Sequence, residues 1–393
     1  MSNTNTVIVG AKRTAIGSFQ GQFKNVAATR LGAVAIKGAL DQSGLSADDV
    51  DEVIMGCVLP AGLGQAPARQ AALYAGLPHG TGATTINKVC GSGMKALMLA
   101  NDLINAGSAD VVVAGGMESM TRAPYMLPNA RSGYRMGHGQ ILDHLFYDGL
   151  QNPYDDQMMG QFAESCVDKY QFSREAQDSF SITSISRSME AMGNGQFAAE
   201  VTPVTVSDRH GDTVVDSDEE PPRCKIEKIP NLRPAFRKEG SVTAANSSKI
   251  SDGAAALVVV SAAEAGQRGL QPLASIVAHA THSQEPEWFT TAPIGAIGKL
   301  LDKAGWSLDD VDLFEINEAF AVVTMAAMNE LDLDHEKVNV NGGACALGHP
   351  IGASGARIVV TLINALQQRG LKRGIAALCI GGGEATALAI ELP

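Results

Sequence analysis

One stretch of this chain occurs twice, and the second copy begins 261 positions after the first. Residues 36–51 (IKGALDQSGLSADDVD) align with residues 297–312 (IGKLLDKAGWSLDDVD), and nine of the 16 positions are identical. Each copy predicts an amphipathic helix that stops at a glycine, a serine-capped turn and then an apolar strand. A chance match between two amphipathic helices is one explanation of this repeat. The other, which we favour, is a fold with two similar halves.

The correspondence extends beyond the repeated unit at almost the same offset. Residues 92–95 match residues 354–357, and each set opens a long apolar helix. An apolar strand follows each helix, and a further strand precedes each half; these four strands are expected at 109–114, 375–380, 6–9 and 274–277. The same order of strands and helices in both halves predicts an α/β fold.

A segment without a counterpart separates the halves. It holds a Pro/Gly/Tyr/Met-rich stretch (123–153), a helical stretch (156–193) and a charged loop, in which basic residues outnumber acidic ones seven to two over 223–249. Residues 252–260 then predict a buried strand that returns to the first half. The predicted domains are an N-terminal half (1–120 with 249–270), a loop domain (121–248) and a C-terminal half (271–393).

Charge and cysteine content exclude several classes of protein. The net charge is −12, which argues against nucleic acid or an anionic membrane as a general partner. No apolar run reaches the roughly 18 residues of a membrane span. Six cysteines in 393 residues do not form a disulfide framework, and the first residues show no cationic, apolar signal region. We therefore expect reduced thiols and a cytoplasmic protein.

Cys90 is the first candidate for chemistry. It lies in the sequence NKVCGSG (87–93), between a predicted strand and the helix that begins near Ser92. The amino-terminal end of a helix favours a thiolate and lowers the pKa of a cysteine. The flanking glycines allow a substrate to approach the backbone. A nucleophile and a buried structural thiol both remain open for this residue.

His349 lies in the corresponding loop of the second half, because Ser354 is the repeat partner of Ser92. The pseudo-symmetry therefore predicts that His349 and Cys90 meet at the same end of the fold. Imidazole is the natural general base for a thiol. A hydrogen-bonded bystander histidine is the alternative.

Two further loops belong to the same end. Cys379 ends the last predicted strand of the second half and precedes three glycines, of which Gly381 can offer its backbone N–H to an oxyanion. Asn317 follows the strand of the repeated unit, where it can orient a water or donate to a carbonyl oxygen. A helix cap is the alternative for Asn317.

Other cofactors are disfavoured. The chain has no Cys-x-x-Cys pair, which argues against zinc, so no metal ligand is predicted. The glycine-rich runs lack the dinucleotide-binding and phosphate-loop spacings, which argues against NAD and ATP.

With Cys90, NEAF (317–320), GHP (348–350) and CIGGG (379–383) in this order, the sequence resembles the thiolases along essentially its whole length. The resemblance implies two βαβαβαββ halves in a five-layer αβαβα arrangement and a loop domain that covers coenzyme A. It also implies the reversible condensation of two acetyl-CoA molecules to acetoacetyl-CoA and CoA through an acyl-cysteine. Coenzyme A thioesters are substrates in this family, and no tightly bound cofactor is implied.

The resemblance also assigns roles. Cys90 would be the acyl-accepting nucleophile, deprotonated by His349, and Cys379 would remove the α-proton of the second acetyl-CoA. One oxyanion site would comprise His349 and a water held by Asn317; the other would use the backbone N–H groups of Cys90 and Gly381. Residues implied beside the acyl, pantetheine and nucleotide groups are Met159, Ala244, Ser248, Phe289, Ala319 and Phe320. Arg223 and Lys228, in the basic segment, are expected to meet the CoA phosphates, unless that segment is only a solvated charge run.

One departure bears on specificity. Many acetoacetyl-specific thiolases carry His-Met-Gly where this chain has Met-Met-Gly (158–160). A broad-chain 3-ketoacyl-CoA thiolase is therefore the second hypothesis, and a non-catalytic acyl-CoA-binding protein is the third. Thiolases assemble as homodimers or homotetramers, and we expect residues 123–143 to form the tetramer contact.

Overall fold

A computed structural model describes residues 6–209 and 211–393 of the chain. The N-terminal half contains β1 (Thr6–Arg13), α1 (Ala28–Ser43), β3 (Glu52–Gly56), α3 (Ser92–Asn105), β5 (Val111–Ser119) and β10 (Ser251–Ser261). The C-terminal half contains, in matching order, β11 (Ala274–Ser283), α7 (Ala292–Ala304), β12 (Leu313–Ile316), α10 (Ser354–Arg369), β13 (Arg373–Ile380) and β14 (Glu384–Glu391). The two pseudo-symmetric halves predicted from the repeat are confirmed.

Smaller elements complete each half: β2 (Gly17–Ser18), α2 (Pro67–Tyr74), β4 (Gly82–Ile86) and α6 (Ala262–Arg268) in the first, and α8 (Ala321–Leu331) and α9 (Ala344–Leu347) in the second. β4 pairs in parallel with β3. Its counterpart in the second half is reduced to a single bridge between Phe314 and Val338. The prediction that Cys379 ends the last strand is wrong, because β14 follows β13 and pairs antiparallel with it.

The two half-sheets join into one ten-stranded sheet, whose main path runs β12-β13-β14-β11-β1-β10-β5-β3-β4. The junction is a short antiparallel pairing in which Thr6, Val7 and Ile8 face Ile276, Ser275 and Ala274. Within each half, the strand that leads to a candidate site loop, β4 before Cys90 and β13 before Gly381, pairs in parallel with the strand of the repeated unit. The carboxyl ends of these strands therefore lie at a common edge.

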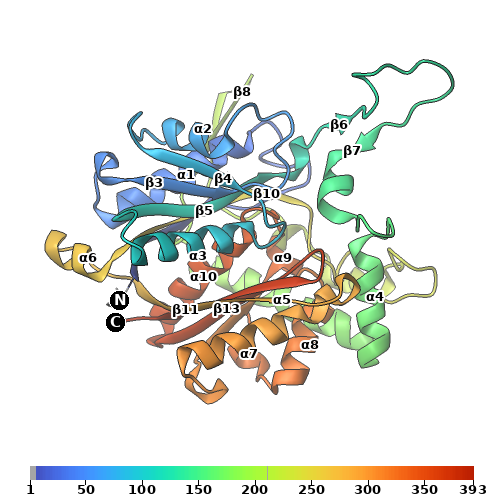
Figure 1. Cartoon of the computed structure of the whole chain (residues 1–393). Helices are drawn as coiled ribbons and strands as arrows, with labels where there is room; N and C mark the ends of the chain where they lie inside the picture. The colour runs from blue at the N-terminus through green and yellow to red at the C-terminus, as the bar shows by residue number, and fades with distance from the viewer. Residues whose placement is uncertain (1–5, 210) are drawn as a thin grey trace.

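Five layers result from this arrangement (Figure 1). α3 and α10 lie between the two half-sheets and share one apolar core with their inner faces. α1 and α2 cover the outer face of the first half, and α7 covers that of the second. Val112 faces the inner core and Val113 the outer one, which explains why the strands are continuously apolar rather than alternating.

The two central helices approach each other backbone to backbone. Gly93 and Gly355 occupy matching positions in the first turn of α3 and α10. A Cβ atom on Gly355 would lie 2.5 Å from the backbone N of Met94, and one on Gly93 would lie 2.8 Å from the backbone N of Ala356. This contact brings the loops before α3 and α10 to the same end of the molecule.

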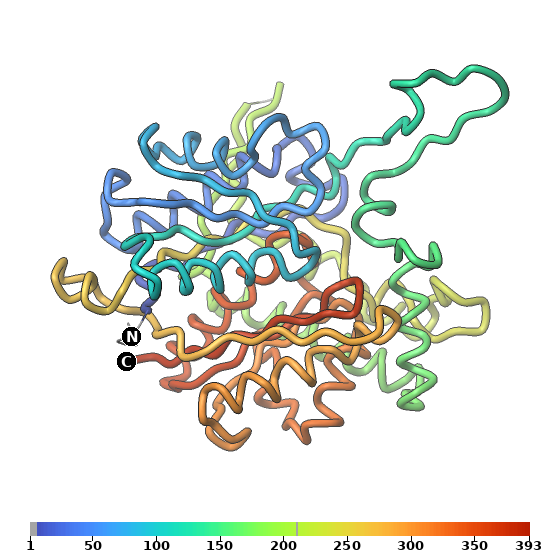
Figure 2. The backbone as a smooth tube through the Cα atoms, in the orientation of Figure 1, coloured from blue at the N-terminus to red at the C-terminus, as the bar shows by residue number. Residues whose placement is uncertain are grey.

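Near its start, the insertion between the halves forms an arm, residues 125–143, that projects from the body (Figure 2). β6 (Tyr125–Met126) and β7 (Leu142–Asp143) pair at its base. The helical stretch predicted at 156–193 is two helices, α4 (Met159–Tyr170) and α5 (Arg174–Gly193), because Gln171 adopts a left-handed conformation at φ 55°. β8 (Val204–Asp208) and β9 (Gly211–Val215) form a hairpin. Within the described ranges, no helix has the length and apolar character needed to cross a membrane.

Candidate active site

Cys90 lies on a tight turn between β4 and α3. The N–H of Gly91 donates to the carbonyl of Lys88 (3.0 Å), and the Ser92 hydroxyl donates to the carbonyl of Val89 (2.7 Å). Val89 adopts φ 44°, which is uncommon for a β-branched residue. Strained backbone of this kind is concentrated at functional sites. The turn therefore holds the Cys90 side chain in one fixed direction.

The surroundings of Cys90 are apolar. Its side chain packs against a cluster that comprises Val58, Leu59, Met120, Leu145 and Ile351. Burial raises the pKa of the Cys90 thiol to about 11, although the N–H of Gly381 and its own N–H favour the thiolate. The expectation of a lowered pKa is thus wrong, because the cost of desolvation exceeds the stabilisation of the thiolate by these two N–H groups. In the resting site Cys90 is a neutral thiol.

His349 is buried, and its hydrogen bonds fix which ring nitrogen carries the proton. Nδ1 lies 2.6 Å from the Ser354 hydroxyl oxygen, and that hydroxyl donates its only hydrogen to the carbonyl of Pro350 (3.0 Å). We therefore assign the proton to Nδ1, as the donor to Ser354, and the lone pair to Nε2. Nε2 is buried without any hydrogen-bond partner.

Burial, aided by the positive charge of Arg357, lowers the pKa of His349 to about 3. The imidazole is consequently neutral at physiological pH and available as a base. The backbone N–H of His349 donates to the carbonyl of Lys249 (3.0 Å), so the loop that carries the ring is also anchored.

Asn317 follows β12 and is almost fully buried. Its backbone N–H donates to the carbonyl of Ala377 (3.0 Å), whereas neither polar atom of its side chain has a partner. Buried polar atoms are nearly always satisfied, so this amide fits a water or a ligand group. The helix-cap alternative is wrong, because α8 begins at Ala321 and its cap residue is Phe320.

Cys379 is the penultimate residue of β13 and packs in an apolar cluster that includes Met159, Phe162, Phe289, Ala319 and Phe320. Burial, together with the charge that a Cys90 thiolate would carry, raises the pKa of Cys379 well above its usual value. A Cβ atom on Gly381 would lie 3.4 Å from the Met159 sulfur. Both thiols, Gly381 and Met159 are thus brought together.

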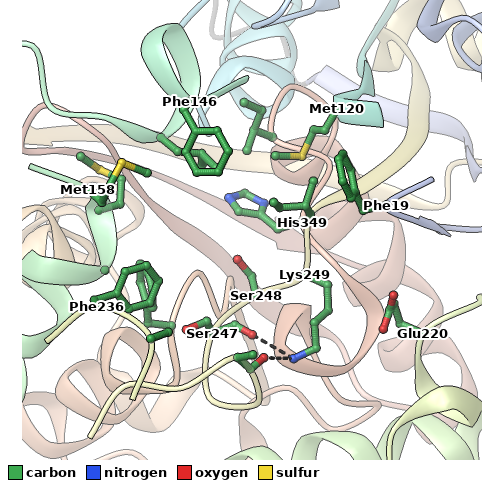
Figure 3. Close-up of a pocket in the computed structure, with 18 residues that line it drawn as sticks. Phe19, Met120, Phe146, Met158, Glu220, Phe236, Ser247, Ser248, Lys249 and His349 are labelled. Carbon is green, nitrogen blue, oxygen red and sulfur yellow. Dashed lines mark hydrogen bonds between the residues drawn. The ribbon is translucent and has the colours of Figure 1, made fainter. Parts of the chain in front are cut away.

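A cavity of about 440 Å³ opens beside His349 (Figure 3). Of the residues predicted to act or to bind, those that line it are Met159, Ala244, Ser248, Phe320 and His349. Ser248 lies beside Ala319 because its N–H donates to the Ala319 carbonyl (2.9 Å). Most of the remaining lining is apolar and comes from segments distant in sequence: Phe19, Met120, Phe146, Leu150, Met158, Phe236 and Ile351.

A second cavity of about 230 Å³ adjoins the first, since Ala244 and Lys249 line both. Its basic residues are Arg223, Lys225, Lys228 and Lys249. Arg223 forms an ion pair with Glu219 (3.0 Å), and the Lys249 ammonium donates to the carbonyls of Ala244, Ala245 and Ser247. The two cavities together form a path from an apolar, His349-bearing end to a basic end.

Sequence models of the two thiolase domains match nearly the whole chain, with the N-terminal domain at residues 6–263 and the C-terminal domain at residues 270–392. The chain belongs to the thiolase family.

Individual relatives of this thiolase point to one branch of the family. It is 50% identical to an acetyl-CoA acetyltransferase of Pseudomonas aeruginosa over 98% of both chains, and 49% identical to one of Cupriavidus necator over 99% of both. The crystal structure of the Bacillus anthracis acetyl-CoA acetyltransferase superimposes with a TM-score of 0.97 at 44% identity, covering 99% of each chain.

The thiolase site contains groups that sequence reasoning missed. Lys249 lies between the two cavities, and Glu118 is buried at the end of β5 behind Cys90. A glutamate next to the last residue of an otherwise largely apolar strand (VVVAGGMES, 111–119) is the signal that could have identified Glu118. The cavity-lining Phe19, in a turn, and Phe146, in a short helix (Leu145–Leu150), carry no such signal, because the position of each depends on the tertiary fold.

Proposed function

We propose that this thiolase is an acetyl-CoA C-acetyltransferase, which condenses two acetyl-CoA molecules reversibly to acetoacetyl-CoA and CoA. The observation that carries the proposal is the near 50% identity to acetyl-CoA acetyltransferases along almost the whole chain. The geometry supports it, because a neutral histidine with a free Nε2 and two thiols gather at one end of the fold.

In the first half-reaction, His349 Nε2 accepts the proton of the Cys90 thiol while the sulfur attacks the acetyl carbonyl. The C–S bond to CoA breaks, and the departing CoA sulfur takes up a proton. The acetyl-cysteine that forms is itself a thioester, so the transfer is nearly isoenergetic. The unpartnered amide of Asn317 is suited to hold a water that stabilises an oxyanion.

In the second half-reaction, Cys379 acts in its thiolate form, which its raised pKa makes a strong base, and removes an α-proton from a second acetyl-CoA. The resulting carbanion forms a C–C bond to the acetyl carbonyl, the bond to the Cys90 sulfur breaks, and the Cys90 sulfur takes up the proton that Cys379 removed. The Gly381 N–H already points to the Cys90 sulfur, so it is placed to stabilise the oxyanion of this step, with the Cys90 N–H. Removing one such donor typically costs about 3–4 kcal/mol.

The paired cavities suggest how the substrate lies. Pantetheine would follow Ala244, Ser248 and the Ala319–Phe320 segment, and the acyl group would lie near Met159 and Phe289. The phosphates would meet Arg223 and Lys228 in the basic cavity. A cytoplasmic location and a homodimer or homotetramer remain part of the proposal, based on the reduced thiols and the exposed arm.

A broad-chain 3-ketoacyl-CoA thiolase is the second candidate. The observation that favours it is the apolar wall beside His349, where Met120, Met158 and Ile351 offer no polar group to reject a longer acyl chain.

Thiolysis rates for 3-ketoacyl-CoA substrates from C4 to C12 separate the two candidates. A steep fall after C4 supports the acetyltransferase, whereas a flat profile supports the broad-chain enzyme. Labelled acetyl-CoA should leave an acid-stable label on the wild-type enzyme and on a Cys345→Ser control, a buried thiol outside the site. Cys90→Ser should take up no label; equal labelling of Cys90→Ser would disprove the acyl-cysteine mechanism.

A further inference from the structure

Glu118 is a buried carboxylate that the proposed chemistry does not use. It lies at the end of β5 with no exposed surface. One carboxylate oxygen accepts the N–H groups of Val58 (2.9 Å) and Gly352 (2.9 Å), and the other accepts the N–H of Leu59 (3.1 Å). No Lys, Arg or His among the described residues forms an ion pair with it. Three backbone donors therefore take the place of a cationic partner.

These three donors belong to two separate loops. Val58 and Leu59 follow β3 in the first half, whereas Gly352 follows His349 in the second half. The fit is close, because a Cβ atom on Gly352 would lie 2.7 Å from the Glu118 carboxylate and 3.1 Å from the Cα of Cys57. Glu118 thus ties the His349 loop to the first half of the molecule.

The same loops enclose Cys90. Val58, Leu59 and Ile351 belong to the apolar cluster against which the Cys90 side chain packs. The titratable groups that face Glu118 are Cys57, whose sulfur lies 3.6 Å away, and Cys90, whose thiol pKa is raised further by the negative charge of Glu118. The pKa of Glu118 is itself raised to about 7 by burial.

We propose that Glu118 is a positioning residue for acyl transfer, which holds the His349 loop and the wall around Cys90 in one fixed arrangement. The inference rests on the proposed roles of Cys90 and His349. One carboxylate oxygen accepts from Val58 in one loop and from Gly352 in the other, so it joins the two loops directly. The other oxygen adds the hydrogen bond from Leu59. Among the hydrogen bonds of the described residues, no other side chain joins these two loops.

Glu118→Gln tests the proposal. The amide places an NH2 donor where one oxygen now accepts, either opposite the N–H of Leu59 or opposite those of Val58 and Gly352, so at least one anchoring hydrogen bond should be lost. We expect the kcat/KM of acetoacetyl-CoA thiolysis to fall roughly tenfold or more, because small displacements of catalytic groups are costly. Loss of the negative charge should also shift the pH midpoint of Cys90 alkylation by iodoacetamide, followed by peptide mass spectrometry, to a lower value.

Two comparison variants make the test specific. Glu164→Gln removes another buried carboxylate that accepts backbone N–H groups, those of Ser241 and Val242, but does not face Cys90; its alkylation midpoint should match the wild type. Glu118→Asp keeps the charge with a shorter reach, so it should lose rate while its midpoint stays near the wild-type value.

The proposal is overturned if Glu118→Gln retains the wild-type rate and midpoint, or if Glu164→Gln shifts the Cys90 midpoint equally. If Glu118→Gln does not fold, the rate and midpoint of Glu118→Asp decide the matter by the same criteria. Uptake of acetyl label by the wild type, and its loss in Cys90→Ser, remain independent of all three variants. A failure of this inference can therefore be distinguished from a failure of the proposed function.

Discussion

At the residue scale, burial sets the resting protonation of both groups proposed for acyl transfer. It raises the pKa of Cys90 to about 11 and lowers that of His349 to about 3, so each group is neutral in the empty site. Proton transfer from thiol to imidazole is then unfavourable before substrate binds. Formation of the thiolate is expected to be coupled to attack on the thioester, where the developing charge passes to the substrate oxygen.

A pH titration of His349 checks this description. Because the pKa of His349 lies below its ordinary value of 6.5, the neutral form should persist as the pH falls from 8 to 5. Nitrogen-15 NMR of enzyme with isotope-labelled histidine rings should show the Nδ1–H tautomer of His349 throughout this range. The His349 signal is identified by its absence from the spectrum of His349→Asn. Protonation with a midpoint near 6.5 would contradict the burial argument.

The lowered pKa of His349 also makes the stability of the folded protein depend on pH. In the unfolded chain His349 takes up a proton below about pH 6.5, whereas in the folded protein it does so only near pH 3. The contribution of His349 to stability is therefore fully present above pH 6.5 and is lost progressively as the pH falls toward 3.

At the element scale, the sequence repeat predicted most of the fold because both copies carry the same apolar periodicity. The helices and strands of both halves follow from it, and so does the meeting of the Cys90 and His349 loops. The pairing of β1 with β11 could not be predicted, since no local pattern specifies which strands join two half-sheets. The helix break at Gln171 was also missed, because a left-handed glutamine at a helix end has no distinctive sequence signal.

The candidate site was predicted where chemistry demands particular residue types, at Cys90, Asn317, His349 and Cys379. The raised pKa of Cys90 could not be predicted from the sequence, because the desolvation of its thiol depends on apolar side chains from several segments. Likewise, the free Nε2 of His349 depends on where the Ser354 hydroxyl donates its hydrogen, which only the folded structure determines.

The close contact between α3 and α10 leads to a prediction for Gly355. A Gly355→Ala side chain would meet the Met94 backbone, which cannot move without shifting α3. Overpacking of this kind typically costs about 1–3 kcal/mol. Gly298→Ala in α7, where an added Cβ meets nothing within 4 Å, is the matched control and should be neutral or slightly stabilising. Thermal unfolding compares the two variants; equal midpoints would show that the helices can separate at little cost.

At the scale of the whole molecule, the projecting arm is the feature least consistent with an isolated chain. Met136 is 91% exposed, Ile141 66% and Tyr125 70%, all on a segment that leaves the body of the protein. Exposed apolar groups gathered on one segment indicate a contact with another protein surface. This agrees with the proposal that the arm joins dimers into a tetramer.

The arm can be tested by removing its apolar tip contacts. The double variant Met136→Ser with Ile141→Ser should reduce the particle mass measured by light scattering from tetramer to dimer. Val214→Ser on the β8–β9 hairpin removes a side chain of similar exposure (62%) outside the arm and should leave the mass unchanged. If the double variant keeps the wild-type particle mass, the proposal that the arm forms the tetramer contact is wrong.

The pairing of β1 also bears on how the chain is synthesised. β1 leaves the ribosome long before its neighbours in the sheet, β10 and β11, which emerge only after the rest of the first half and the whole insertion. At about 5–20 residues per second, this leaves an unpaired apolar strand for on the order of ten seconds or more. The central sheet can close only late in translation, so the nascent chain is expected to depend on a chaperone that shields this strand until β11 arrives.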